Sequence, residues 1–571
     1  MRRTLLTLLL ATSPAAAAAQ HDPAVIRQSL PRDVRREVVD RWNGSNAIRS
    51  SERLEIDAGQ EVRGDVAVLR GPLTIAGHVA GNVLAVNSDV LLRPSARIDG
   101  QLLVVGGEVE GRNSSRVDGA IRIYRQSLAY HEDGPRIVAI DEESVADDES
   151  WWHRIERRHE GNWSEVLRVA QAGPYNRVEG LPVELGPVIN RRTSWGSIRF
   201  DAAVVVRTGS SFRSDKGDYG HNLRGEFRLG HSRGIGVGAQ VASVVDPVES
   251  WQLSDLEVAL GSFLARRDYR DYYQRHGGRA FVTLYGRRDL SLTGSFGEER
   301  WSSRAVSDPF TVFNDNRPWR PNPVVDEGLF HVANTTLRFD TRTDPDDPSS
   351  GWYVNADVEH GRGVISTPAP TSDTRIMMAG KISDYTRGLF DLRRYNRLGP
   401  DAQLNMRVVV GGWLGGDALP LERRLSVAGP GALPGFDFRS PHTGFDVGTC
   451  NVGFLVSGQP AECERVALAQ IEYRGDLRID FTGDWEDWPR HYHSAHGDVV
   501  WVMFADAGRG WDAGPAAGSI VPDRGLLPPL STFRSDVGLG LDFGGIGVYA
   551  AKAVSDPSQP VNFFVRLRHR F

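Results

Sequence analysis

Charged residues recur at every second position in the extended segments of the second half of this 571-residue chain. The clearest run, ALAQIEYRGDLRIDF, places five charges on one face: Glu472, Arg474, Asp476, Arg478 and Asp480. Successive side chains of a strand point to opposite faces, so this face is ionic along its whole length. An unpaired charge in a protein core costs several kcal/mol, and the pattern therefore argues against a soluble sandwich.

A wide, closed antiparallel barrel accommodates this pattern, because apolar faces can contact lipid while charged faces line a water-filled lumen. Closure also pairs every backbone group within the hydrocarbon. The chain ends in the same alternation, PVNFFVRLRHRF, with Phe563, Val565 and Leu567 on the apolar face. The intervening arginines, Arg566 and Arg570 among them, are expected to face water. The sequence therefore predicts an all-β fold dominated by a C-terminal transmembrane barrel.

Fifteen strands can be placed in the barrel region. They are expected to begin near Tyr175, Trp195, His221, Gly234, Gly278, Leu290, Val332, Gly351, Arg375, Ala402, Val466, Val499, Thr532, Ile546 and Pro560. Bacterial outer-membrane barrels have even strand numbers, so we expect sixteen, with the remaining strand between Trp301 and Gly328. Residues 253–277 have leucines at helical spacing and are predicted to form a helix in a loop.

The first nineteen residues have the features of an export signal: two arginines, an apolar centre and an alanine-rich A-x-A cleavage site. The mature chain is therefore expected in an oxidising compartment. Its two cysteines, Cys450 and Cys463, are predicted to form a disulfide that closes one loop, and two unpaired thiols are the alternative.

A weak repeat precedes the barrel region. Its units are opened by Gly64, Gly81, Gly100 and Gly119, at spacings of 17, 19 and 19 residues. Short β runs at a period near 20 are typical of a β-solenoid, whose coils bury apolar residues against one another. The stretch resembles the bactofilin-like, polymer-forming solenoids, which implies self-association; a spacer or cap is the alternative.

We expect five successive segments. They are a signal peptide at 1–19, a partly helical segment at 20–50, the β-solenoid at 51–127, an acidic linker with short helices at 128–173 and the barrel at 174–571.

Motifs in the last third of the chain resemble the BamA-like insertase and translocase superfamily. The stretch LSVAGPGALPGFDFRS resembles the sixth loop of that superfamily, with the motif at Leu433, Pro434, Gly435 and Phe436. A later strand carries the pattern Phe-x-Asp-x-Gly at Phe504, Asp506 and Gly508. Terminal Phe571, with Phe563, Val565 and Leu567 before it, looks like the recognition signal of outer-membrane barrels.

Two departures from that superfamily stand out. The resemblance implies a loop arginine that folds into the lumen and pairs with acidic groups, here Glu472 and Asp506, but Pro434 occupies its position. We expect Arg439, or else Arg423 or Arg424, to take its place, and lumen water with other arginines is the alternative. The polypeptide-transport-associated domains of the superfamily are also replaced, by the solenoid.

Reactive motifs are scarce. With 67 basic and 73 acidic residues the charge gives no reason to expect a nucleic-acid partner. Neither a Gly-x-Ser-x-Gly elbow nor a phosphate-binding loop occurs, so we expect no enzyme and no cofactor. The histidines of RHYHSAH, residues 490–496, are predicted to lie in a polar interfacial turn rather than to bind zinc.

The expected function follows from the resemblance. It implies an outer-membrane barrel with a periplasmic N-terminal domain that assists insertion or translocation of polypeptides, or of lipids, through a seam between the first and last strands. The expected partners are outer-membrane lipid and client polypeptides or envelope components. The alternative is a structural barrel that anchors the solenoid to the outer membrane.

Overall fold

The structure is a computed structural model that describes residues 30–571 with several short gaps and longer gaps at 140–154, 371–378, 439–449, 451–460, 478–498 and 514–527. The expected signal peptide, the acidic stretch and the histidine-rich turn lie outside the described residues. None of the helices within the described ranges is long and apolar enough to cross a membrane.

The N-terminal domain is a β-solenoid of thirteen short strands in three parallel sheets, ordered β1-β4-β7-β10-β13, β11-β8-β5-β2 and β12-β9-β6-β3. The strands are β1 (Ala47–Ser50), β2 (Leu54–Ile56), β3 (Glu61–Val62), β4 (Asp65–Leu69), β5 (Leu73–Ile75), β6 (His78–Val79), β7 (Val83–Val86), β8 (Val90–Leu92), β9 (Arg97–Ile98), β10 (Leu102–Val105), β11 (Val109–Glu110), β12 (Arg116–Val117) and β13 (Ile121–Tyr124). The predicted solenoid is therefore confirmed.

The repeated glycines have a steric reason. A Cβ on Gly81 would lie 2.4 Å from the carbonyl oxygen of Gly64 in the coil before it, and Gly100 and Gly119 meet the preceding glycine in the same way. Real Cβ atoms do not approach backbone this closely, so each coil can stack on the last only if the position is glycine.

Helix α2 (Arg32–Asn43) covers the five-stranded sheet from outside. Val34, Val38 and Trp42 are buried in one cluster with residues of that sheet and with Leu128 and Ile137, the latter from the hairpin β14 (Tyr130–Asp133) and β15 (Arg136–Ala139). A second apolar cluster fills the inside of the coils. The three middle strands of the five-stranded sheet, β4, β7 and β10, are thus buried on both faces.

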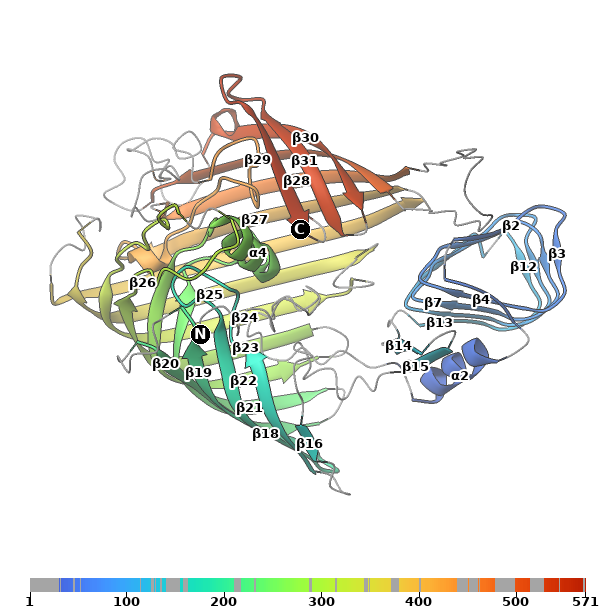
Figure 1. The fold of residues 1–571 in the computed structure, drawn as a ribbon, viewed down its shortest axis with the longest axis horizontal. Coiled ribbons are helices and arrows are strands. Elements are labelled where there is room, and N and C mark those ends of the chain that lie inside the picture. Colours follow the sequence, from blue (N-terminus) through green and yellow to red (C-terminus); the bar gives the residue numbers. More distant parts are fainter. Residues whose placement is uncertain are drawn as a thin grey trace.

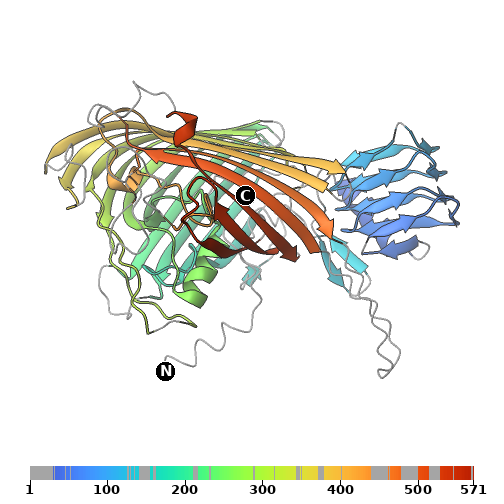
Figure 2. The same ribbon diagram turned by 90° about the horizontal axis from the view of Figure 1, so that it is seen from above.

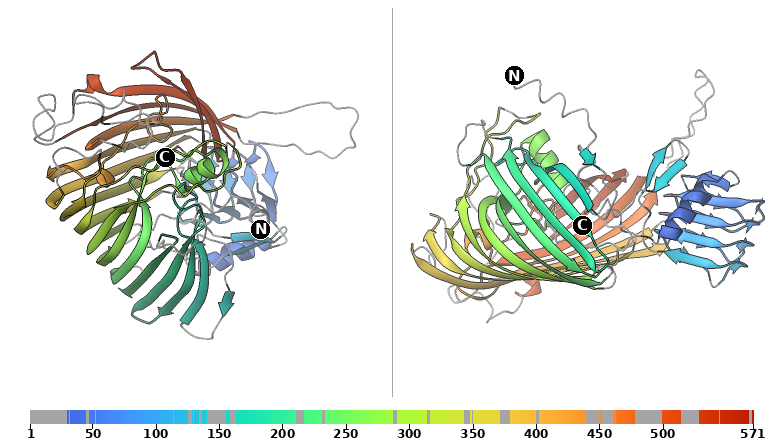
Figure 3. Two further views of the ribbon diagram at one scale, coloured as in Figure 1. Left: turned by 60° about the vertical axis from the view of Figure 1, so that its left-hand side comes forward. Right: turned by 90° about the horizontal axis from the view of Figure 1, so that it is seen from below.

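The rest of the chain forms one antiparallel sheet, ordered β16 to β32 without crossovers (Figures 1 and 3). Its strands are β16 (Ile155–Arg157), β17 (Trp163–Gln171), β18 (Pro182–Arg192), β19 (Gly196–Arg207), β20 (Tyr219–Leu229), β21 (Gly234–Pro247), β22 (Tyr272–Tyr285), β23 (Leu290–Ser303), β24 (Glu327–Asp340), β25 (Gly351–Thr367), β26 (Lys381–Gly399), β27 (Ala402–Gly416), β28 (Arg465–Leu477), β29 (Val499–Trp511), β30 (Arg534–Phe543), β31 (Ile546–Ala553) and β32 (Val561–Leu567). The predicted sixteen strands are β17–β32, and the three-residue β16 is added outside them. Two 3-10 turns, η1 (Leu421–Arg423) and η3 (Leu530–Thr532), lie in the connections.

The prediction was wrong about which strand was missing. Residues 304–326 contain no strand within their described part, and the sixteenth strand is β17, in the segment expected to hold short helices. Nine residues of β17 pair with β18 in an antiparallel ladder. The spacing of Trp163, Val166 and Leu167 suits a helix as well as a strand, and pairing with β18 decides between them. The edge strand is therefore β17, not one that begins near Tyr175.

The two faces of the sheet differ as predicted. On β21, Ile235, Val237 and Val241 are exposed on the outer face, whereas Gln240 is buried on the inner face. Many charged side chains on the inner face pair with one another rather than contacting only water. Arg199 binds Asp201 at 2.8 Å and Arg224 binds Glu226 at 3.0 Å. Closely paired charges are satisfied without bulk water.

Closure of the barrel by a backbone ladder is not observed. Strand β32 pairs with β31 but, among the described residues, neither β16 nor β17 pairs with it. The two ends of the sheet, β16–β18 and β30–β32, stand apart in Figures 1 and 3. The closed cylinder that we expected is thus not formed. The sheet is open between its first and last strands, and we call this opening the seam.

The solenoid lies at one end of the curved sheet, here called the solenoid end (Figures 1 and 2). Arg397, at the end of β26, forms an ion pair with Asp89 and lies 3.8 Å from the carboxylate of Glu110. The hydroxyl of Ser350, just before β25, donates to Glu108 at 3.3 Å. Polar contacts therefore join the two domains.

Candidate functional site: the seam and the loops that fill the lumen

Loop six, residues 417–464, connects β27 to β28. Its described residues, chiefly 417–438, fold back inside the curved sheet. The motif residues Leu433 and Phe436 are buried. The side chain of Asn562 in β32 donates to the carbonyl oxygen of Pro434 at 3.1 Å, and Gln470 in β28 donates to that of Ala432 at 3.1 Å. Loop six is therefore held by strands on the C-terminal side of the seam.

A hydrophobic cluster forms around loop six. It contains Trp251, Val409, Leu425, Val427, Ala428, Ala432, Leu433, Phe436, Cys450, Cys463, Val466, Leu468 and Ala553. The predicted disulfide between Cys450 and Cys463 is confirmed and belongs to this cluster. Gly508 of the Phe-x-Asp-x-Gly pattern borders the cluster, because a Cβ there would lie 3.2 Å from Val427 of loop six.

Gly435 marks the closest approach of loop six to the wall. Its backbone N–H donates to Asp536 Oδ2 in β30 at 2.7 Å. A Cβ at this position would lie 2.5 Å from Cβ of Asp536 and 2.8 Å from the backbone nitrogen of Ala553. A side chain at Gly435 is therefore incompatible with the position of the loop.

Among the described residues, Arg570 rather than an arginine of loop six pairs with Asp506. The Arg570 guanidinium binds Asp506, lies 3.9 Å from Glu472 and sits 3.6 Å from the ring centroid of Phe504. Expected Arg439 lies outside the described residues. The charge that Pro434 lacks is therefore supplied by the C-terminal tail.

Arg423 and Arg424, the alternative partners expected for Asp506, bind other carboxylates. Arg423 donates from Nε to Glu359 in β25 at 2.7 Å and stacks over Trp301, 4.1 Å from its centroid. Arg424 lies 3.5 Å from the carboxylate of Glu464. Arg423 does fold into the lumen, but it fastens the base of loop six rather than its tip.

The expectation that the tail arginines face water and that Phe571 continues the strand was wrong. Strand β32 ends at Leu567, after Phe563 and Val565, which are 78% and 56% exposed on the outer face. Beyond it the carbonyl oxygen of Phe571 accepts a 2.7 Å hydrogen bond from Tyr395 in β26. Arg570 is buried, because its ion pair with Asp506 draws the tail inward.

Loop three, residues 248–271 between β21 and β22, reaches the last strand. It contains α4 (Asp255–Ala265), the helix predicted in this segment, which starts with a capping box between Ser254 and Glu257. The Glu257 carboxylate also binds Arg566 and accepts the backbone N–H of Leu567 at 3.1 Å. It thus occupies a donor on the edge of β32 that a neighbouring strand would otherwise use.

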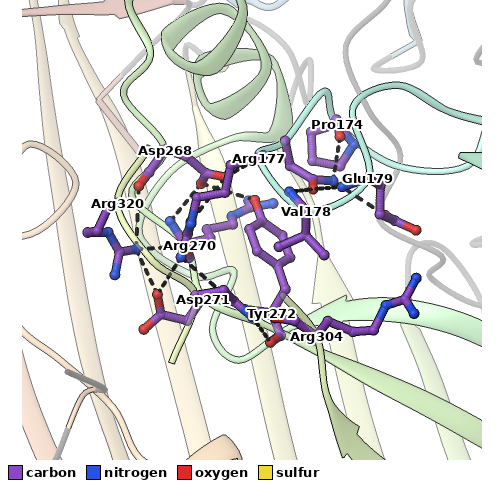
Figure 4. Close-up of polar contacts among 12 residues, drawn as sticks. Pro174, Arg177, Val178, Glu179, Asp268, Arg270, Asp271, Tyr272, Arg304 and Arg320 are labelled. Carbon is purple, nitrogen blue, oxygen red and sulfur yellow. Dashed lines mark hydrogen bonds and ion pairs between the residues drawn. The ribbon is translucent and has the colours of Figure 1, made fainter. Parts of the chain in front are cut away.

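The other end of loop three holds the start of the barrel (Figure 4). Arg177, between β17 and β18, lies 3.1 Å from the carboxylate of Asp268 and 2.8 Å from that of Asp271. Burial alone would lower the pKa of Arg177, but these two carboxylates outweigh it and raise the pKa. Tyr175 packs edge-on against Phe263 of α4. Loop three therefore spans the seam from the β17–β18 connection to β32.

Solved structures similar to this chain include "The crystal structure of BamA from Haemophilus ducreyi lacking POTRA domains 1-3", at 13% identity and a TM-score of 0.38, covering 76% of this chain and 80% of that one. CdiB from Acinetobacter baumannii is 10% identical at a TM-score of 0.29, covering 71% and 60%, and CdiB from Escherichia coli is 10% identical at 0.28, covering 72% and 63%. The chain thus spans about three fifths of the CdiB structures. No protein-family model and no curated protein matches it.

BamA, whose superfamily the sequence motifs resemble, is thus among the similar structures. The described residues contain no group of three or more metal-ligating side chains. Two features of the site were not predicted from the sequence. They are the tail arginine beside Asp506 and the contact of α4 with the last strand. The leucine spacing of residues 253–277 predicted a helix, but nothing in it indicated a contact with the last strand.

Proposed function

We propose that this chain is an outer-membrane barrel of the BamA-like kind that assists insertion or translocation of polypeptides by accepting a strand at its seam. Unpaired N–H and C=O groups on an exposed edge are a template for strand addition. Lipid passage through the same seam is part of the proposal, and Glu472, Asp506 and loop six act by fixing the lumen side of that seam.

The observation that carries the proposal is strand β16. This three-residue segment pairs with β17 from outside the sixteen strands, Ile155 opposite Leu167 and Arg157 opposite Glu165. It covers only part of the nine-residue edge. The edge of β17 thus already receives an added strand from the chain itself.

The outer face supports a membrane location. Large apolar side chains are exposed along the strands, and examples from four of them are Phe200, Phe227, Phe296 and Phe390. Apolar surface on this scale is costly in water at about 25 cal/mol per Å² and favourable against acyl chains. With the solenoid end toward the periplasm, loops three and six lie at the outer side.

Site-specific photo-crosslinking in cells tests the seam. A photoreactive residue at Val169 in β17 or Val565 in β32 is expected to capture nascent barrel polypeptides, and one at Val358, exposed in the middle of the wall, is expected to capture none. Depletion of the protein is expected to lower the level of other outer-membrane barrels. Normal barrel levels together with equal capture at all three positions would exclude the insertase function.

A structural anchor is the second candidate, and the docking of the solenoid favours it. Arg397, Ser350 and their acidic partners fix the solenoid against the wall. Such a barrel would present the solenoid to envelope components or to the solenoid of another copy. Loss of envelope attachment on deletion of residues 51–127, with barrel assembly unaffected by depletion, would select this function.

A further inference from the structure

We propose that the lumen contains a guanidinium-binding site, formed by Glu472, Asp506 and Asp536 with Phe504, and that the chain's own Arg570 is its exchangeable occupant. The ligand class is an arginine side chain near the end of a polypeptide. The inference goes beyond the proposed function, because the site and its occupant can be tested whether or not the chain inserts other polypeptides.

The first argument is charge. Asp506 in β29 and Asp536 in β30 lie directly opposite each other in the ladder, and Glu472 lies in the adjacent strand β28. Carboxylates facing each other repel, and the repulsion is relieved by a cation beside them or by a proton shared between them. Arg570 provides that cation through its contact with Asp506.

The second argument is geometry. The Arg570 guanidinium is covered by the ring of Phe504, 3.6 Å from its centroid, and a cation over an aromatic ring gains more when both are desolvated. Arg570, Glu472 and Asp506 are each no more than 2% exposed. A carboxylate on one side and an aromatic face on the other are suited to the flat guanidinium rather than to the compact ammonium of lysine.

The third argument is that the site has capacity left. Glu472 Oε2 is buried and has no hydrogen-bond partner among the described residues, and two of the Arg570 nitrogens are in the same condition. The 3.9 Å separation of Arg570 and Glu472 is too long for a hydrogen bond. The tail therefore fills the site with an imperfect match, and a freely positioned guanidinium can match it better.

The occupant connects the site to the seam. Arg570 lies three residues beyond the end of β32, so its binding holds the end of the last strand inside the lumen. The hydrogen bond from Tyr395 to the Phe571 carbonyl oxygen fixes the same tail against β26. An incoming arginine that takes the site would release the tail, and with it the end of β32.

Chemical rescue of the full-length protein in detergent micelles tests the site. Arg570→Ala is expected to lower the unfolding temperature by a few degrees, and millimolar methylguanidinium is expected to recover at least half of the shift. The double variant Arg570→Ala, Asp506→Asn is expected not to respond. In the wild-type protein the probe should compete with Arg570 and lower the yield of a cysteine cross-link between the tail and β26. Arg199→Ala is the control, because its partner Asp201 is partly exposed, and it is also expected not to respond.

The position of the C-terminal tail provides a second measurement, which would not change if Arg570 only contributed to stability. A cysteine pair at Tyr395 and Phe571 is expected to cross-link when Arg570 is present and to lose most of its yield in Arg570→Ala. Methylguanidinium should restore the unfolding temperature without restoring the cross-link, because the probe replaces the tail. Rescue that is independent of Asp506, or an unfolding temperature and cross-link that ignore Arg570, would overturn the proposal.

Discussion

Glu257, in the first turn of α4, binds Arg566 in the last strand of the barrel, 309 residues further along the chain. The same carboxylate accepts the backbone N–H of Leu567. A helix of loop three thus satisfies an edge donor of β32 that is not used by β17. Loop three closes the seam with side chains where the strands do not close it with a ladder.

Glu257→Ala is expected to free the edge of β32. Hydrogen bonds to charged groups contribute about 1.5–3 kcal/mol, so the amide of Leu567 should exchange about tenfold faster or more. Hydrogen exchange of the peptide that contains residues 561–567 measures this. Ser254→Ala is the matched control, because it removes the other half of the capping box without touching β32. Equal acceleration in both variants would mean that Glu257 acts only as a helix cap.

Gly435→Ala is expected to displace the tip of loop six. The new Cβ would meet Asp536 and the backbone of Ala553 at distances that real contacts do not reach. We expect a loss of about 1–3 kcal/mol in unfolding free energy and new protease cleavage within loop six.

Gly415→Ala, in β27, is the control for this substitution. No atom lies within 4 Å of the Cβ that it would add, so neither stability nor protease resistance should change. Unchanged protease resistance in Gly435→Ala would show that loop six does not depend on this close approach.

Arg397→Ala is expected to weaken solenoid docking more than Asp89→Asn does. Arg397→Ala leaves the partly buried Asp89 carboxylate without a compensating charge, whereas Asp89→Asn removes the charge that needs compensation. The yield of a cysteine cross-link between the solenoid and the β26–β27 rim measures docking. A larger loss in Asp89→Asn would contradict this account of the interface.

The stability of the folded chain is also expected to depend on pH through Asp89. Burial raises the pKa of Asp89, Arg397 and the backbone N–H of Glu108 offset part of that shift, and the charges of Glu108 and Glu110 add to it. The folded chain therefore binds this proton more tightly than the unfolded chain does. The resulting contribution to the unfolding free energy should be fully present below the ordinary carboxyl range near 4 and should be lost as the pH rises through the raised pKa. Unfolding temperatures at mildly acidic and neutral pH measure this, and Asp89→Asn should remove this contribution.

The strands and their faces could be predicted from the sequence because each side chain of a barrel strand reports its own environment. Phe563, Val565 and the other apolar positions of β32 contact the outside whatever the neighbouring strands do. The repeat of glycines in the solenoid could also be recognised in the sequence, because each coil repeats the same close contact. The disulfide needed only two cysteines and an oxidising compartment.

Features that depend on distant partners could not be predicted. Trp163, Val166 and Leu167 suit either a helix or a strand until β18 is placed beside them. The alternation places Arg570 on the lumen face, but nothing in it indicates that this arginine lies beside Asp506. The resemblance implied an arginine partner for Asp506 from loop six, and the described arginine that lies beside it is Arg570.

The apolar clusters of the solenoid and of loop six share no residue, and the contacts that bridge the two domains through Arg397 and Ser350 are polar. Cooperative melting follows continuous apolar packing rather than a few ionic links. Scanning calorimetry should therefore resolve two heat-absorption peaks, and chaotropes should unfold the coils of the solenoid while the large antiparallel sheet keeps its disulfide-bonded interior.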